Sequence, residues 1–162
     1  MELKWTNARD RGFIDLAARL DSHLDALSPA QHALCAPHNL LDGDALVALI
    51  FDNGQPVACG ALRLLGDHTG ELKRMFVHPA FRGHGLAREV LRALEARAVT
   101  EGCRMLVLET SPALSAAVSL YRSVGFRPID HYGPYRGMNT LCMGKAVGED
   151  AATASLQTGR GQ

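Results

Sequence analysis

The sequence predicts a single α/β domain, because two patterns follow one another along the chain. Between residues 45 and 77, apolar segments alternate with turn residues such as Asp52-Asn53-Gly54, which is typical of strands joined by hairpins. A glycine-rich turn, an amphipathic helix and a further apolar segment follow, and this order is typical of a β-α-β unit. The 162 residues, 47% of them hydrophobic, suffice for one core and are too few for two ordinary domains.

The N-terminal part is expected to form a strand, a long helix and an irregular connection. Residues 3–6 are predicted to be a strand, and Asn7 can cap the helix that follows. The helix is indicated by apolar residues at helical spacing, namely Phe13, Leu16, Ala17, Leu20, Leu24 and Leu27. Pro29 and Pro37 then favour a broken helix or loop over residues 28–44.

The middle of the chain is expected to hold most of the sheet. The predicted strands are residues 45–51, 56–65, 71–77 and 104–109. Turn residues at 52–55 and 66–70 separate the first three, and a helix running through Val99 precedes the fourth. The last two strands therefore flank a helix, which favours a parallel pair by the usual crossover rule.

The C-terminal part is expected to complete the domain and then lose regular structure. Pro112 suits the first turn of another helix, and Gly125 suits its left-handed end. Two closing strands are predicted at residues 126–129 and 139–145. From there the composition turns to small polar residues without periodicity, so the domain is placed at 1–147 and a disordered tail at 148–162.

The charge balance excludes several classes of partner. Lys plus Arg number 17 and Asp plus Glu 17, so the broad positive field of a nucleic-acid or anionic-membrane binder is absent. The N-terminus lacks the pattern of a secretory signal and no apolar run is long enough to span a membrane, so we expect a cytoplasmic protein. Its four widely spaced cysteines are interpreted as small buried hydrophobes.

One short cluster raises the question of a metal. His32, Cys35 and His38 have an even spacing that could contact a zinc ion. No fourth ligand lies nearby in the sequence, so an ordinary loop is favoured and no metal is predicted.

The sharpest local signal is Arg82-Gly83-His84-Gly85-Leu86-Ala87, which lies between a predicted strand and the start of a helix. Glycines let the main chain approach a ligand closely, and the N–H groups at a helix start attract an anion such as a pyrophosphate. The Walker pattern is absent, and Arg88 stands where a Rossmann turn needs a small residue. The turn instead fits [Q/R]-x-x-G-x-[G/A].

This motif and its surroundings resemble the GNAT superfamily of acyl-CoA-dependent N-acyltransferases. Residues 71–79 before the turn, 106–110 after the helix and 120–126 at the next helix end are similar to the superfamily's strand 4, strand 5 and motif B, in the same order. The resemblance covers residues 45–146 most clearly. It implies a GNAT fold, in which a mostly antiparallel, split sheet is flanked by helices.

The resemblance also implies a co-substrate and its contacts. Acetyl-CoA would place its pantetheine arm along the main chain of Met75, Phe76 and Val77. Its pyrophosphate would meet the main-chain amides of Arg82, Gly83, His84, Gly85, Leu86 and Ala87. An amine would attack the thioester directly, with a backbone amide near Met75 stabilising the oxyanion.

Two residues take catalytic roles by the same resemblance. Tyr121 stands where the superfamily has the general acid that protonates the departing thiolate; its other interpretation is a core aromatic on the apolar face of a helix. Glu71 stands where some members have a catalytic glutamate. Its other interpretation is a solvated charge or an ion-pair partner of Lys73 or Arg74.

Three more residues are candidates for the acceptor side. Glu109 could orient the substrate or cap the next helix, while Tyr135 and Arg136 offer a stacking face and a cation in a loop that could also be a plain turn. Arg136 and Glu71 together suit a small zwitterionic amine, such as an amino acid. A non-catalytic acyl-CoA-binding regulatory domain and an interaction module with a vestigial CoA site remain alternatives, and a homodimer is plausible.

Overall fold

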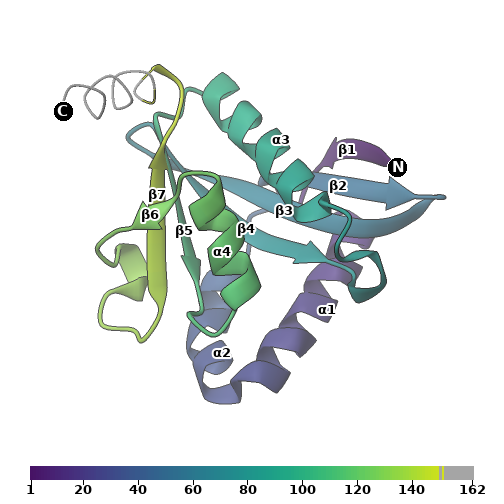
Figure 1. The fold of residues 1–162 in the computed structure, drawn as a ribbon, viewed down its shortest axis with the longest axis horizontal. Coiled ribbons are helices and arrows are strands. Elements are labelled where there is room, and N and C mark those ends of the chain that lie inside the picture. The colour runs from purple at the N-terminus through teal and green to yellow at the C-terminus, as the bar shows by residue number, and fades with distance from the viewer. Residues whose placement is uncertain (150, 152–162) are drawn as a thin grey trace. The chain divides into compact units, whose positions relative to one another are not determined.

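A computed structural model describes residues 1–149 and 151. Over these residues the chain forms seven strands and four α-helices (Figure 1). It divides into two compact units, residues 1–63 with 72–94 and residues 64–71 with the described part of 95–162. The strand and helix assignments confirm the predicted α/β class.

The first unit contains the hairpin region and the long N-terminal helix. Its strands follow the order β1-β2-β3-β4, and the β1–β2 and β2–β3 pairs are antiparallel. Their bounds are β1 Glu2–Thr6, β2 Leu46–Asp52, β3 Gln55–Gly66 and β4 Thr69–Val77, the last residues of β3 and the first of β4 belonging to the second unit. The helices are α1 Arg11–Leu27, α2 Pro29–Cys35 and the first part of α3 Leu86–Thr100.

The predicted turns and the predicted irregular connection are both present. Asn53 and Gly54 have φ angles of 47° and 77° between β2 and β3, and Asp67 and His68 have 48° and 57° between β3 and β4. Two successive positive φ angles are the signature of the type I′ turn that joins tight hairpins. The expected broken helix at 28–44 is α2 followed by one 3₁₀ turn, Ala36–Asn39.

Helices cover both faces of the sheet in this first unit. The cluster on the α1 face consists of Phe13, Leu16, Leu20, Val47, Leu49, Cys59, Ala61 and Phe76. Gly60 points the opposite way, since a Cβ there would lie 2.7 Å from Val90 and 2.8 Å from Leu94, both on α3. Successive strand residues alternate between faces, so β3 is buried between α1 and the start of α3.

The cap of α1 differs from the sequence prediction. Asp10, not Asn7, is the N-cap, because its carboxylate accepts hydrogen bonds from the main-chain N–H groups of Gly12 and Phe13. Asn7 instead accepts from the N–H of Arg9 and closes the turn before the helix. Both residue types can cap, and the cap falls on the one whose side chain reaches the first free N–H groups.

Replacing Asp10 by alanine is therefore expected to destabilise the protein by about 1 kcal/mol, the usual cost of a lost N-cap. Urea denaturation followed by circular dichroism measures this change. Asp15→Ala is the matched control, because Asp15 is an exposed acid on the same helix. Equal free energies of unfolding for the two variants would contradict the assignment of the cap.

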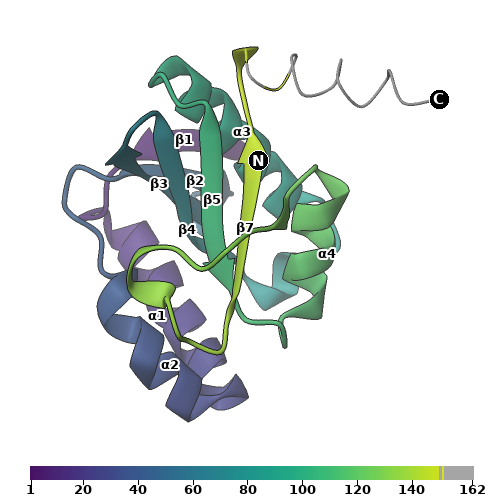
Figure 2. The same cartoon turned by 90° about the vertical axis from the view of Figure 1, so that its left-hand side faces the viewer.

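The second unit contains the remaining strands and one complete helix. Its strand order is β5-β7-β6, and both pairs are antiparallel; Figure 2 shows β5 and β7 side by side. The elements are β5 Met105–Thr110, α4 Ser115–Ser123, β6 Arg127–Pro128 and β7 Leu141–Ala146.

Two C-terminal predictions need adjustment. Helix α4 begins at Ser115, so Pro112 belongs to the turn before it, while Gly125 ends the helix with the predicted positive φ of 104°. The strand expected at 126–129 is reduced to the two residues of β6. Of the predicted tail, residues 150 and 152–162 lie outside the described residues.

All four cysteines are buried, as the sequence indicates. Burial raises the pKa of the Cys59 thiol to about 12, and it also raises the pKa of Cys103 and of Cys142. These thiols therefore stay protonated and act as small apolar groups. None of the helices formed by residues 1–149 and 151 contains an apolar segment of membrane-spanning length.

Candidate active site

The glycine turn lies in the first unit, between β4 and α3. The chain leaves β4 at Val77, makes one 3₁₀ turn over Pro79–Phe81, and enters α3 at Leu86. Gly83 and Gly85 have φ angles of 81° and 76°, and a Cβ at either position would have no atom within 4 Å. The side of the turn that a side chain would occupy is open, so a ligand can approach the main chain there.

The N–H groups of this turn are available to an anion. Over the described part of the chain, those of Gly83, His84 and Gly85 donate to no other group, and the first helical bond runs from Glu89 N–H to the Gly85 carbonyl. Unpaired N–H groups at the start of a helix of this length form an anion site with a partial positive charge. Gly83, His84 and Gly85 thus offer donors for the predicted phosphate contacts, whereas the Arg82 N–H donates to the Pro79 carbonyl at 3.4 Å.

Two side chains stabilise the shape of the turn. The Arg82 Nε donates to the Val77 carbonyl at 3.2 Å, and its guanidinium lies 5.8 Å from the ring centroid of Phe76. The Nδ1 of His84 lies 3.0 Å from the Arg82 carbonyl. Arg82 and His84 thereby hold the loop that the glycines leave open.

Tyr121 lies on α4 in the second unit, and its ring belongs to the core. The residue is 7% exposed, and the ring packs edge-on against Phe126 at 5.8 Å between centroids. Burial, together with the charge of Glu109, raises the pKa of the Tyr121 phenol. Among the described residues its hydroxyl has no hydrogen-bond partner. Tyr121 therefore presents a protonated hydroxyl that no other group uses.

Glu71 belongs to the second unit and is buried, with 1% of its surface exposed. The Tyr132 hydroxyl donates to its Oε2 at 2.6 Å. Arg74 pairs with Asp21 instead, so Glu71 is neither a solvated charge nor the ion-pair partner of Arg74, while the alternative of a pair with Lys73 stays a prediction. Burial and the hydrogen bond to Glu71 raise the pKa of Tyr132, which keeps that phenol a donor.

Glu109 lies on β5 and contacts the neighbouring strand region. The Thr140 hydroxyl donates to Glu109 Oε1 and also lies 2.9 Å from the Thr110 carbonyl. Leu114 is the N-cap of α4, and no side chain caps this helix. The alternative role of Glu109 as a helix cap is therefore wrong, and its carboxylate is positioned by Thr140.

The two candidate residues of the loop after β6, Tyr135 and Arg136, differ in exposure. Tyr135 is 0% exposed and packs edge-on against Tyr132, so its ring supports the loop and has no open face for stacking. Arg136 is exposed and makes no hydrogen bond or ion pair with another described residue. Sequence reasoning missed Tyr132, the residue of this loop that reaches Glu71.

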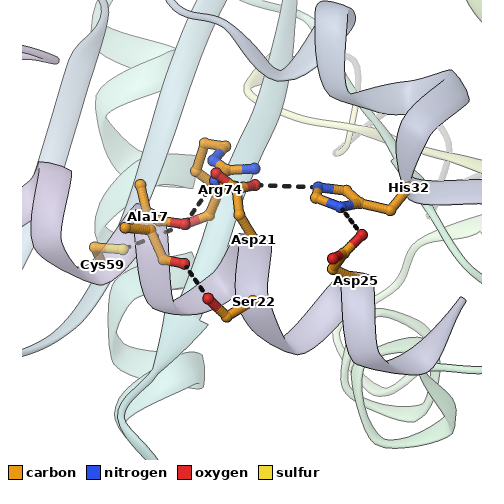
Figure 3. A network of polar contacts seen from close by, with 8 residues as sticks. Ala17, Asp21, Ser22, Asp25, His32, Cys59 and Arg74 are labelled. Carbon is orange, nitrogen blue, oxygen red and sulfur yellow. Dashed lines mark hydrogen bonds and ion pairs between the residues drawn. The ribbon is translucent and has the colours of Figure 1, made fainter. Parts of the chain in front are cut away.

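A polar network in the first unit surrounds Arg74 (Figure 3). Arg74 pairs with Asp21 at 2.8 Å, and His32 lies 3.3 Å from Asp21 and 3.4 Å from Asp25. These contacts use both ring nitrogens of His32, the residue that the sequence suggested as a zinc ligand. Among the described residues, no group of three or more His, Cys, Asp or Glu side chains is arranged to hold a metal.

The network forms the polar side of a pocket of about 400 Å³. Asp21, His32 and Arg74 line it together with apolar side chains that include Phe13 and Leu41. A pocket with an apolar wall and a few polar groups is the usual form of a small-molecule site.

Comparisons with known proteins show the family of the chain. Residues 8–126 match the acetyltransferase (GNAT) family, and the chain belongs to that family. An IAA acetyltransferase from Azospirillum brasilense is 34% identical over 124 residues, which are 75% of this chain and 81% of that protein. N-acetylaspartate synthetase from Homo sapiens is 42% identical over 69 residues, which are 41% of this chain and only 23% of the synthetase.

Solved structures support the same fold. A protein from Klebsiella pneumoniae assigned as an acyl-CoA N-acyltransferase has a TM-score of 0.75 and 31% identity, covering 90% of this chain and 98% of its own. A GNAT-family acetyltransferase from Staphylococcus aureus has a TM-score of 0.69 with 15% identity, covering 91% and 100%. The predicted GNAT fold is confirmed.

Proposed function

We propose that the protein transfers an acetyl group from acetyl-CoA to the primary amine of a small molecule. The observation that carries this proposal is Tyr121, a protonated, nearly buried phenol whose hydroxyl has no partner among the described residues. Expulsion of a thiolate needs a proton donor, and a tyrosine with a raised pKa keeps its proton at physiological pH. Tyr121 gives that proton to the CoA sulfur.

The glycine turn binds the phosphates of acetyl-CoA. The open side of Gly83 and Gly85 lets oxygen atoms reach the main-chain N–H groups, and the start of α3 adds favourable charge. This local anion site suits a chain whose formal net charge is +0, because no general positive field attracts the ligand. A main-chain N–H near Met75 holds the oxygen of the acetyl group as negative charge develops on it.

Glu71 receives the proton that the amine loses. A buried carboxylate with one strong hydrogen bond is fixed in position, and the Tyr132 hydroxyl gives it that bond. Amines are mostly protonated at neutral pH, so a base reached directly or through water assists the attack. The glycine turn and Met75 belong to the first unit, whereas Glu71 and Tyr121 belong to the second. Membership of the GNAT family supports the proposal that they act in one reaction.

The acceptor is an amino acid or a similar small zwitterionic amine. Arg136 is exposed in the loop that also supplies Tyr132, the partner of Glu71. A guanidinium binds a carboxylate with good geometry, so Arg136 can hold the acceptor's acid group. The N-acetylaspartate synthetase that is similar over 69 residues is named for an acetylated amino acid, which supports this class of acceptor.

An acceptor screen with matched variants tests this assignment. Free amino acids, polyamines, aminoglycosides and histone-like peptides are compared by acetyl-CoA-dependent thiol release. We expect amino acids to be preferred, and Arg136→Ala to raise the acceptor KM about tenfold through the lost charged hydrogen bond. Arg19→Ala, which removes an exposed arginine on α1, is the control.

Two outcomes would contradict the acceptor assignment, namely strong preference for a polyamine or aminoglycoside and an unchanged KM in Arg136→Ala. Tight acetyl-CoA binding without transfer to any amine would instead favour a non-catalytic acyl-CoA-binding regulatory domain.

A further inference from the structure

Arg74 has a backbone conformation that its residue type rarely adopts. Its φ angle is 58°, although it lies inside β4 and is flanked by ordinary strand residues. A left-handed conformation costs energy for a residue with a Cβ, and within a strand it bends the chain as a β-bulge does. Such a conformation persists where the surrounding structure holds it.

The contacts of Arg74 supply that restraint. The Arg74 side chain is 6% exposed, and its Nη2 donates to the Ala17 carbonyl and to Asp21, both at 2.8 Å (Figure 3). The carbonyl of Arg74 accepts from the Cys59 thiol at 3.4 Å. Helix α1 therefore holds the side chain of Arg74, and β3 contacts its main chain.

Helix α2 stabilises the part of α1 that holds the Arg74 side chain. His32 lies between Asp21 and Asp25, which are one helical turn apart on the same face of α1. The Asp21 carboxylate contacts both His32 and the guanidinium of Arg74, as Figure 3 shows, so His32 restrains the carboxylate that pairs with Arg74. A chain of polar contacts thus runs from α2 through α1 to one backbone position of β4.

We infer that Arg74 is a positioning residue, which orients the main-chain N–H that follows it at Met75. The inference rests on the proposed function, in which an N–H near Met75 holds the acetyl oxygen. Side chains of Arg74 and Met75 point to opposite faces, since Arg74 contacts α1 whereas the Met75 Sδ lies beside Gly60 on the α3 side. Arg74 therefore acts on the reaction through the backbone. Preorganised donors lose much of their effect when they shift by a fraction of an ångström.

Two substitutions at position 74 separate the backbone role from other roles. Arg74→Ala removes the guanidinium and leaves a residue that disfavours φ near 58°, whereas Arg74→Gly removes the guanidinium but accepts this φ without penalty. We expect kcat to fall about tenfold in Arg74→Ala and to stay within about threefold of the unsubstituted protein in Arg74→Gly. The acceptor KM and the Kd for acetyl-CoA, measured by calorimetry, should change little in either.

Other roles give different results. If the guanidinium binds the acceptor in the adjacent pocket, both variants raise the acceptor KM equally, which would overturn the inference. If Arg74 only stabilises the fold, both variants lower the melting temperature and leave kcat unchanged. This result would also overturn the inference.

A measurement without substrate separates this inference from the proposed function. Amide hydrogen exchange of the peptide covering β4 is compared in Asp21→Ala and in Asp15→Ala, the control on the same helix. We expect faster exchange in β4 for Asp21→Ala alone, because Asp21 pairs with Arg74 whereas Asp15 makes no contact with it. Equal exchange would show that α1 does not hold β4. Faster exchange in a protein that transfers no acetyl group would contradict the proposed function and leave the anchoring intact.

Discussion

Replacing Tyr121 by phenylalanine is expected to lower kcat about 10²-fold, the usual effect of losing a general acid. The substitution keeps the ring that packs on Phe126 and removes only the hydroxyl. That hydroxyl has no partner over the described residues, so its removal leaves no buried group unsatisfied. Steady-state kinetics with the preferred acceptor measures the change.

Two further measurements establish where the effect of Tyr121→Phe arises. Calorimetry with acetyl-CoA should show an unchanged Kd, and thermal unfolding should show a melting temperature close to that of the unsubstituted protein. A fully active Tyr121→Phe variant would show that Tyr121 has only a structural role in the core.

Replacing Gly85 by glutamate is expected to abolish detectable binding of acetyl-CoA. The new side chain would enter the open space beside the turn, and its charge would repel the phosphates at the start of α3. The φ of 76° adds a backbone cost that must be separated from the effect on binding.

Gly54→Glu is a control closely matched to this change. Gly54 lies in the turn between β2 and β3 with a φ of 77°, and a Cβ there would have no atom within 4 Å. The two variants should lose similar stability, while only Gly85→Glu loses binding in calorimetry. An unchanged affinity for acetyl-CoA in folded Gly85→Glu would show that the glycine turn is not part of the binding site.

The fold and the glycine turn were predictable because their signals are local. Alternating apolar segments, two tight turns and the run from Arg82 to Ala87 are each readable within a few residues. The turn at Asn53-Gly54 and the left-handed end of α4 at Gly125 have the φ angles that their residue types indicate. Local chemistry determined these features, so the sequence identified them.

The features that were missed depend on residues far apart in the chain. Glu71 and Tyr132 are 61 positions apart, and no sequence pattern around either residue indicates a contact with the other. The loop contains both Tyr132 and Tyr135, of which only Tyr135 was predicted to contact the acceptor, and only the packing decides that its ring is buried. The positive φ of Arg74 contradicts its residue type, so it is detectable only in the structure.

The contact of His32 with Asp21 and Asp25 has a signal in the sequence, namely the spacing of the two aspartates. Asp21 and Asp25 are four residues apart on α1, so they share a helical face that one side chain of a neighbouring helix can contact. The spacing around His32 indicates only Cys35 and His38, its neighbours in sequence. Its carboxylate partners come from the preceding helix, across the turn at Ser28.

The most direct test is a product analysis of the purified protein incubated with acetyl-CoA and a mixture of free amino acids. Mass spectrometry of the products and quantification of free thiol are performed on the same samples, with Tyr121→Phe in parallel. We expect an N-acetylated amino acid and free CoA in equal amounts, both strongly reduced in Tyr121→Phe. Thiol release without an acetylated amine, or no transfer to any amine despite bound acetyl-CoA, would contradict acetyl transfer as the function of this protein.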